Sequence, residues 1–222
     1  MTHELSKNIE AFAESIQWFG QSSIKIQHAG RSIYIDPFNL KKDDVADVIF
    51  ITHPHFDHYS EKDLKMILSS DTVMFCPNEL VESSKQFGIE KVYGVGPGFE
   101  SEWKGIGIKT VPAYNVLKTD KHPKEKGWVG YVLTFGHVKL YHAGDTERIP
   151  EMKDLDCDIV MLPLGQTYTM ESVADAAAAV MDTTASIAIP IHFGMYEGKA
   201  QDAEQFKTLL SGKIEVKIPV MS

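Results

Sequence analysis

One segment of the chain constrains the fold more than any other. Residues 47–52 (Asp-Val-Ile-Phe-Ile-Thr) form a nearly continuous apolar run that passes directly into His53-Pro54-His55-Phe56-Asp57-His58. An apolar run of this kind predicts a strand that is buried on both faces of its sheet. Pro54 excludes a helix at the end of that strand, because proline lacks the backbone N–H that a helix interior needs. We therefore expect three imidazoles and one carboxylate to follow a buried strand in an extended turn.

The rest of the chain alternates between strand patterns and helix patterns. Apolar residues at every second position, such as Ile24 and Ile26, predict half-buried strands, and Ser60 followed by acidic residues predicts the start of a helix. The predicted strands are residues 15–19, 23–28, 32–36, 47–52, 72–76, 91–95, 108–113, 128–135, 137–143, 158–162, 186–191 and 214–218. The other predicted helices are residues 78–87, 172–181 and 201–210.

The order of these elements predicts the architecture. Two halves of similar size, each with strands first and then strands alternating with helices, indicate two sheets packed together with helices outside. We expect a four-layer αββα sandwich of the α/β class, formed by residues 1–222 as a single domain. A chain of 222 residues buries enough surface for such a core without covalent cross-links. The polar N-terminus and the turn-rich residues 94–107 are expected to carry no regular element.

Composition narrows the classes of function. The 22 basic and 31 acidic side chains give a net charge of −9, which opposes a nucleic-acid partner bound through phosphate neutralisation. Cys76 and Cys157 form no disulfide or zinc-finger pattern, which favours a reducing compartment. No apolar run is long enough for a membrane span, and the first residues are too polar for a secretory signal. We expect a cytoplasmic protein that acts on a small molecule, with its oligomeric state open.

The side chains after the buried strand indicate a metal site. Imidazole and carboxylate groups are ligands that Zn²⁺, Mn²⁺ and Fe²⁺ accept. In an extended turn His53 and His55 can point the same way, whereas Asp57 and His58 lie further on and can address a second ion. The alternative interpretation is a surface histidine cluster, but chance rarely produces this spacing at the end of a strand.

This H-x-H-x-D-H spacing after an apolar strand resembles the signature of the metallo-β-lactamase superfamily. The resemblance implies an αββα sandwich with one or two metal ions at the sheet edge, and two further positions fit it. Asp145, after Gly144 and a predicted strand, resembles the aspartate that bridges two metals, although it is alternatively a turn residue. His192 follows the strand at 186–191 and resembles the last metal histidine, although it is alternatively a core histidine.

The chain departs from the family pattern at one ligand position. The family places a histidine after a strand and a small residue, whereas this chain has Asn115 after Ala113 and Tyr114. Asparagine is a poor ligand for Zn²⁺, so His122 in the polar loop at 114–127 is the candidate replacement. The alternative is that His122 is an exposed loop residue. The sub-group that the chain most resembles, small stand-alone hydrolases akin to ascorbate-phosphate lactonases and N-acylphosphatidylethanolamine phospholipases, varies in this region.

The resemblance implies two metal sites and a hydrolytic reaction. The first site would contain His53, His55, His122 and Asp145, and the second Asp57, His58, Asp145 and His192. We expect two divalent ions, zinc first with manganese or iron as alternatives, that hold a bridging hydroxide for attack on an ester, lactone or phosphodiester bond in a small, anionic substrate. Asp57 is the candidate catalytic residue that protonates the leaving group, and a metal-bound water is the alternative.

Several questions stay open at this point. Four lysines in the loop at 114–127 would meet an anionic substrate or, alternatively, form a solvated face; they are Lys118, Lys121, Lys124 and Lys126. Tyr168 would touch substrate or pack internally, and His142 would orient a ligand or fill the core. A non-catalytic metal-binding scaffold or ligand sensor on the same fold is the alternative to an enzyme, but the intact H-x-H-x-D-H segment favours the enzyme.

Overall fold

Two β-sheets form the centre of the structure. The computed structural model describes residues 3–41 and 44–222. In spatial order the first sheet contains β1 (Gln17–Gly20), β2 (Ser23–His28), β3 (Arg31–Ile35), β4 (Val48–Phe50), β5 (Val73–Pro77) and β6 (Lys91–Val95). The second contains β13 (Glu215–Val216), β12 (Ile187–Ile191), β11 (Ile159–Pro163), β10 (Val138–His142), β9 (Val129–Phe135), β8 (Ile106–Pro112) and β7 (Glu100–Trp103). In both sheets antiparallel pairs are followed by a parallel set, β3 to β6 and β10 to β13.

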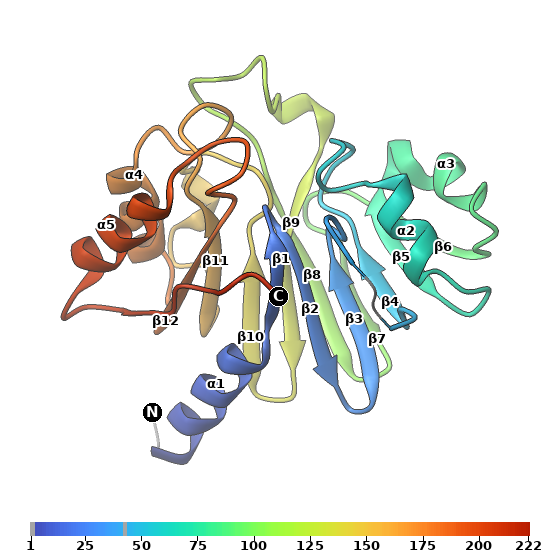
Figure 1. Cartoon of the computed structure of the whole chain (residues 1–222), viewed down its shortest axis with the longest axis horizontal. Coiled ribbons are helices and arrows are strands. Elements are labelled where there is room, and N and C mark those ends of the chain that lie inside the picture. Colours follow the sequence, from blue (N-terminus) through green and yellow to red (C-terminus); the bar gives the residue numbers. More distant parts are fainter. Residues whose placement is uncertain (1–2, 42–43) are drawn as a thin grey trace.

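Helices cover the outer sides of both sheets (Figure 1). Beside the first sheet lie α2 (Glu61–Ile67) and α3 (Val81–Lys85), and beside the second lie α4 (Val173–Asp182) and α5 (Ala200–Leu210). The remaining helix is α1 (His3–Ser15), which contacts β10. Short 3₁₀ turns are η1 (Asn78–Leu80), η2 (Lys124–Lys126) and η3 (Pro150–Met152). The predicted four-layer αββα sandwich is confirmed.

The strand that precedes the histidine segment, residues 53–58, is buried on both faces as predicted. Phe50 of β4 lies in the core between the sheets, where its ring centroid is 5.4 Å from that of Phe75 and 5.1 Å from that of Tyr131. Ile49 lies in a separate outer core with Leu64 of α2. Because β4 runs parallel to β3 and β5, the histidine segment leaves β4 at the edge where those two strands also end.

The expectation of a frayed N-terminus was wrong, because residues 3–15 form α1. Leu5, Ile9 and Phe12 recur with a helical period and pack on the core. The ring centroid of Phe12 lies 4.9 Å from that of Phe135. Tertiary packing of this apolar stripe holds the helix in place.

Two predicted segments also differ in detail from the structure. The helix expected at 78–87 is divided into η1 and the short helix α3. The segment expected to contain turns at 94–107 holds β7, which is largely exposed and so lacks the alternation that reveals a strand. Among the described residues no helix has the length and apolar character needed to cross a bilayer.

Tyr131 provides a test of how the two sheets are joined beneath the histidine segment. Tyr131 lies on β9 of the second sheet. Its buried hydroxyl is 2.9 Å from the carbonyl oxygen of Ile51, directly after β4, and 3.2 Å from that of Phe75 on β5, so it reaches across to the first sheet. We expect Tyr131→Phe to lower the free energy of unfolding by about 1–2 kcal/mol, because a buried carbonyl loses its donor. Urea denaturation measures the change. The control is Tyr93→Phe on the exposed side of β6, and equal effects of the two changes would contradict the prediction.

Candidate metal centre

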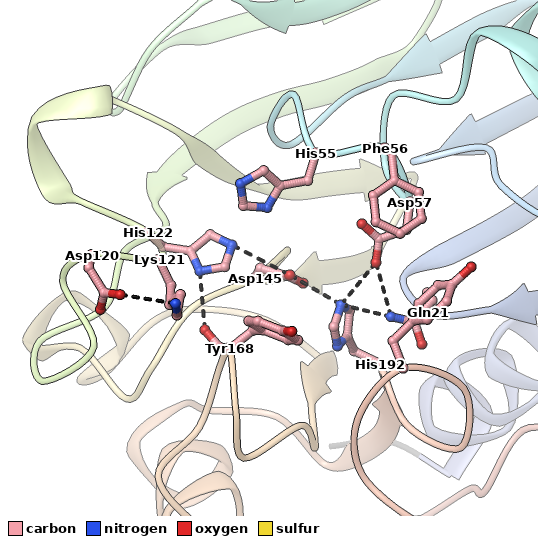
Figure 2. A pocket seen from close by; sticks show the side chains of 11 residues that line it. Gln21, His55, Phe56, Asp57, Asp120, Lys121, His122, Asp145, Tyr168 and His192 are labelled. Carbon is pink, nitrogen blue, oxygen red and sulfur yellow. Dashed lines mark hydrogen bonds and ion pairs between the residues drawn. The ribbon is translucent and has the colours of Figure 1, made fainter.

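The structure brings all seven of the predicted metal-site residues together at one edge of the sandwich. Ligand atoms of one group lie within 4.8 Å of one another, and so do those of a second group; the groups are His53, His55, His122 and Asp145, and Asp57, His58 and His192. Asp145 lies between the groups (Figure 2). Its Oδ2 is 3.5 Å from Nε2 of His122, 3.4 Å from Nε2 of His58 and 3.1 Å from Nε2 of His192.

A buried carboxylate fixes the orientation of two of these histidines. Asp36 follows β3 with a φ of +47° and accepts hydrogen bonds from the backbone N–H and the hydroxyl of Thr52, at 2.8 and 2.6 Å. Because the Thr52 hydroxyl donates to Asp36, it can only accept from Nδ1 of His53, 2.9 Å away. Asp36 also lies 2.7 Å from Nδ1 of His58 and accepts that proton. Both histidines therefore turn Nε2 toward Asp145.

The other two buried histidines have acceptors behind them as well. Nδ1 of His122 lies 3.2 Å from the backbone carbonyl oxygen of Tyr168, and Nδ1 of His192 lies 2.8 Å from Oε1 of Glu197. An acceptor on one ring nitrogen fixes the proton there and leaves a lone pair on the other. In all four rings Nε2 faces the centre of the cluster, where it offers a lone pair whenever the ring is neutral.

Unpartnered nitrogens show that this donor set fits a metal ion. Within the described residues, three histidine nitrogens are buried without a hydrogen-bond partner, namely Nε2 of His58, Nε2 of His122 and Nδ1 of His192. Nε2 of His53 lies only 3.0 Å from Nδ1 of His55. Buried lone pairs that converge in this way are costly unless a cation or proton lies between them. Imidazole nitrogens with a carboxylate match the ligand preference of zinc, manganese and iron.

The electrostatics of the cluster also favour a cation. Burial alone would raise the pKa of Asp145, but the charges of His192 and His58 hold it well below its usual range. Burial opposes protonation of His58, yet the carboxylates of Asp145 and Asp36 raise its pKa to about 10. Burial lowers the pKa of His55 to about 4, with a further contribution from His122. The protein without metal thus recruits protons to balance its buried carboxylates, and a divalent ion competes for the same positions.

Asn115 and His122 lie differently with respect to the cluster. Nδ2 of Asn115 donates to the backbone carbonyl oxygen of Tyr168 at 2.7 Å, so its amide faces away from the cluster. The backbone N–H of Asn115 donates to the carbonyl oxygen of His122 at 2.8 Å. His122 is buried, and its ring reaches the first group of ligand atoms. Asn115 therefore helps to hold the loop that delivers His122.

Gln21 and Glu197 belong to the site but were missed by the sequence interpretation. Nε2 of Gln21 donates to Oδ2 of Asp57 at 3.0 Å and lies 3.0 Å from Nε2 of His192. Oε2 of Glu197 accepts the backbone N–H groups of Thr167 and Tyr168 at 2.8 and 2.7 Å. Gln21 occupies a turn and Glu197 a polar loop, where such residues are ordinary, so no local pattern identifies either one.

Gly165 is the one local signal that points to Glu197. A Cβ atom at Gly165 would lie 1.8 Å from Oε1 of Glu197, so any larger residue there must displace the carboxylate. His142, the other buried histidine near this edge, lies 2.8 Å from the backbone carbonyl oxygen of Ser22 through Nε2 and is not part of either group. His142 is therefore a packed residue of the interior.

Three of the four lysines of the loop at 114–127 are engaged within the chain. Nζ of Lys118 donates to the carbonyl oxygen of Met170 at 3.1 Å and lies 3.5 Å from Glu147. Nζ of Lys124 lies 2.9 Å from Oε1 of Glu151. Lys121 pairs with the neighbouring Asp120 at 3.0 Å (Figure 2). These three lysines are therefore paired within the chain, and Lys121 also lines the cavity beside the cluster.

A cavity of about 420 Å³ opens onto the cluster. It is lined by Gln21, by several aromatic side chains and by five cluster residues, namely His55, Asp57, His122, Asp145 and His192. Its volume falls toward the lower end of the roughly 300–1,000 Å³ typical of small-molecule pockets. Tyr168 lines it too and is 42% exposed, so its side chain is not packed in the interior.

Comparisons with known proteins agree with this geometry. A family model described as the beta-lactamase superfamily domain matches residues 15–192. A UPF0173 metal-dependent hydrolase of Lysinibacillus sphaericus is 31% identical over 219 residues, which covers 91% of this chain and 95% of the relative. A solved structure from Parabacteroides distasonis, proposed to be a metal-dependent hydrolase, is 35% identical with a TM-score of 0.80 and covers 93% of each chain.

A more distant structure shares the fold alone. Igni18, a metallo hydrolase from Ignicoccus hospitalis, is 20% identical with a TM-score of 0.74, over 91% of this chain and 93% of its own. The family model covers most of the residues that form both sheets, and the Lysinibacillus relative matches this chain nearly end to end. The chain therefore belongs to the beta-lactamase superfamily and, within it, to the family of UPF0173 metal-dependent hydrolases.

Proposed function

We propose that the cluster holds two divalent ions within a single hydrolase domain formed by the whole chain. His53, His55, His122 and Asp145 would hold one ion, and Asp57, His58, His192 and Asp145 would hold the other. The observation that carries the proposal is the set of Nε2 atoms that four histidines turn toward Asp145, three of them with an acceptor on the other ring nitrogen and the fourth, His192, with the carboxylate of Glu197 beside its Nδ1. Zinc suits this donor set best, and manganese or iron are the alternatives.

The reaction that we propose is hydrolysis of an ester, lactone or phosphodiester in a small molecule. Divalent ions held by these residues would lower the pKa of bound water, so that a hydroxide is available as a nucleophile at neutral pH, and would polarise the bond that is attacked. The oxygen of water joins the carbonyl carbon or phosphorus, the bond to the leaving oxygen breaks, and that oxygen takes up a proton. Asp57 lines the cavity and is held by Gln21, so it is the side chain placed to carry the proton.

The proposed substrate is a small molecule rather than a nucleic acid, and the proposed location is the cytoplasm. The net charge of −9 disfavours binding to a polyanion. Cys76 and Cys157 are both free and buried, which is typical of proteins from reducing compartments.

Glu197 connects the two proposed ion sites. Its Oε1 supports His192 in the second site, and its Oε2 holds the backbone of Tyr168, whose carbonyl oxygen supports His122 in the first. One buried carboxylate therefore sets the positions of a histidine on each side of Asp145. Supporting groups of this kind typically change metal affinity about 10- to 100-fold when they are removed.

Metal analysis of the purified protein tests the two-ion proposal. We expect two divalent ions per chain by mass spectrometry of the metals. His122→Ala should reduce this number, because the first site loses a ligand that no neighbour replaces. The matched control is His137→Ala in an exposed turn, which should keep two ions. Unchanged metal content in His122→Ala would exclude His122 as a ligand.

Hydrolysis assays test the reaction and the role of Asp57. We expect turnover of at least one of three substrates: ascorbate phosphate, an acyl-lactone or bis-p-nitrophenyl phosphate. Asp57→Asn should lower kcat about 100-fold or more, calculated for enzyme that holds both metal ions, because the change removes a proton carrier. Two bound ions with no turnover on a broad panel would favour the sensor alternative. Full activity of Asp57→Asn at full metal content would exclude the proton-carrying role.

A double-mutant cycle tests the link through Glu197. Gly165→Ala should lower the free energy of unfolding by about 1–3 kcal/mol and reduce metal content, because the new methyl group overlaps the carboxylate. In a Glu197→Ala background, Gly165→Ala should lower the free energy of unfolding by about 0.5 kcal/mol or less, since the methyl group no longer overlaps a carboxylate. Gly96→Ala is the control, because the nearest atom to its Cβ is 3.9 Å away. Additive effects would argue against the link.

A further inference from the structure

Exposed aromatic side chains surround the mouth of the metal-centre cavity. Phe56, Tyr168 and Tyr196 line the cavity and are 64%, 42% and 54% exposed. They come from three segments that follow β4, β11 and β12 at the same edge of the sandwich. Apolar surface left open to water beside a reactive centre is typical of a place where a ligand covers it.

Two of these rings belong to a fixed wall. The ring centroids of Phe56 and Tyr196 are 5.3 Å apart in an edge-to-face arrangement, and Phe38 supports both at 6.1 and 6.2 Å. Phe56 lies between His55 and Asp57 in the chain, so the metal-site residues on either side restrict its backbone. Aromatic pairs in this geometry are favourable and hold the rings in place. The wall is therefore formed before any substrate arrives.

Charge at the mouth is already balanced within the chain. Among the described residues that line the cavity, the only lysine or arginine is Lys121, and it pairs with Asp120 at 3.0 Å. Figure 2 shows this pair on the opposite side of the view from Phe56, with the cluster between them. Lys118 and Lys124 pair with Glu147 and Glu151, and the exposed Lys126 does not line the cavity, so the loop directs little unpaired positive charge into it.

We propose that this cavity selects uncharged esters and lactones that carry an alkyl chain or an aryl ring. The inference rests on the proposed hydrolase function and specifies its substrate class. The scissile carbonyl lies at the metal centre, and the apolar substituent lies against Phe56, Tyr196 and Tyr168. The aromatic wall, rather than the lysine loop, determines specificity.

A matched series of methyl esters tests this specificity in the metal-loaded enzyme. Proton release at constant pH measures kcat/KM for methyl acetate, methyl hexanoate, methyl phenylacetate and the anion of monomethyl adipate. A fully buried methylene strengthens binding about fourfold, so we expect methyl hexanoate to exceed methyl acetate by at least tenfold. The adipate anion has the same chain length as the hexanoate but ends in a carboxylate, and we expect it to react at least tenfold more slowly than the hexanoate.

Variants assign the preference to the wall. Phe56→Ala and Tyr196→Ala should each lower kcat/KM for methyl hexanoate fivefold or more, with a change of less than twofold for methyl acetate. Tyr93→Ala is the control, because Tyr93 is 50% exposed on β6 and does not line the cavity. Lys121→Ala should change kcat/KM less than twofold for both methyl hexanoate and methyl acetate. A faster reaction with the adipate anion, or equal losses in Phe56→Ala and Tyr93→Ala, would overturn the proposal.

A binding measurement separates this proposal from the hydrolase function itself. Saturation-transfer NMR with N-benzylacetamide, an uncharged amide probe, detects occupation of the cavity without turnover. We expect binding that Phe56→Ala weakens and Tyr93→Ala does not. If no ester reacts but the probe binds in this way, the hydrolase proposal fails and the apolar preference stands. If esters or bis-p-nitrophenyl phosphate react but the probe does not bind, the apolar preference fails and the hydrolase proposal stands.

Discussion

The buried carboxylate of Asp145 is the group on which the rest of the site depends. A carboxylate withdrawn from water needs nearby positive charge, and histidines from three parts of the chain surround it. Three of them hold Nε2 within 3.5 Å of its Oδ2, namely His58, His122 and His192. Because they follow strands or loops of both sheets, the two-sheet packing is what makes the cluster possible.

A second layer of acceptors makes the cluster specific for cations. Asp36 supports His53 through Thr52 and supports His58 directly, while Glu197 supports His192 and the loop behind His122. Each acceptor fixes a proton on the outer ring nitrogen and leaves the inner one as a donor to metal. The outer carboxylates therefore orient the histidines of the cluster, and the substrate preference that we propose rests on a different set of residues, the aromatic side chains of the connecting loops.

Most of the fold and of the ligand set could be predicted from the sequence. The apolar run before His53 predicts a strand buried on both faces, and parallel strands end at one edge, so the residues that follow them meet there. Asp145 and His192 follow this rule, which is why short-range patterns identified them. At α1 the helical stripe of Leu5, Ile9 and Phe12 was present in the sequence but was overlooked in a segment that is polar overall, and at β7 the prediction failed because an exposed edge strand has no alternation.

The sequence by itself determined the order of strands and the residue types at their ends, because hydrophobic periodicity and strand direction are local properties. Only the tertiary structure decided that His122 rather than Asn115 reaches the centre, since the carbonyl of Tyr168, far away in the chain, orients both side chains. It also decided that Glu197 joins the site and that the loop lysines are paired internally. A side chain in a loop points where distant contacts hold it, and local sequence carries no record of those contacts.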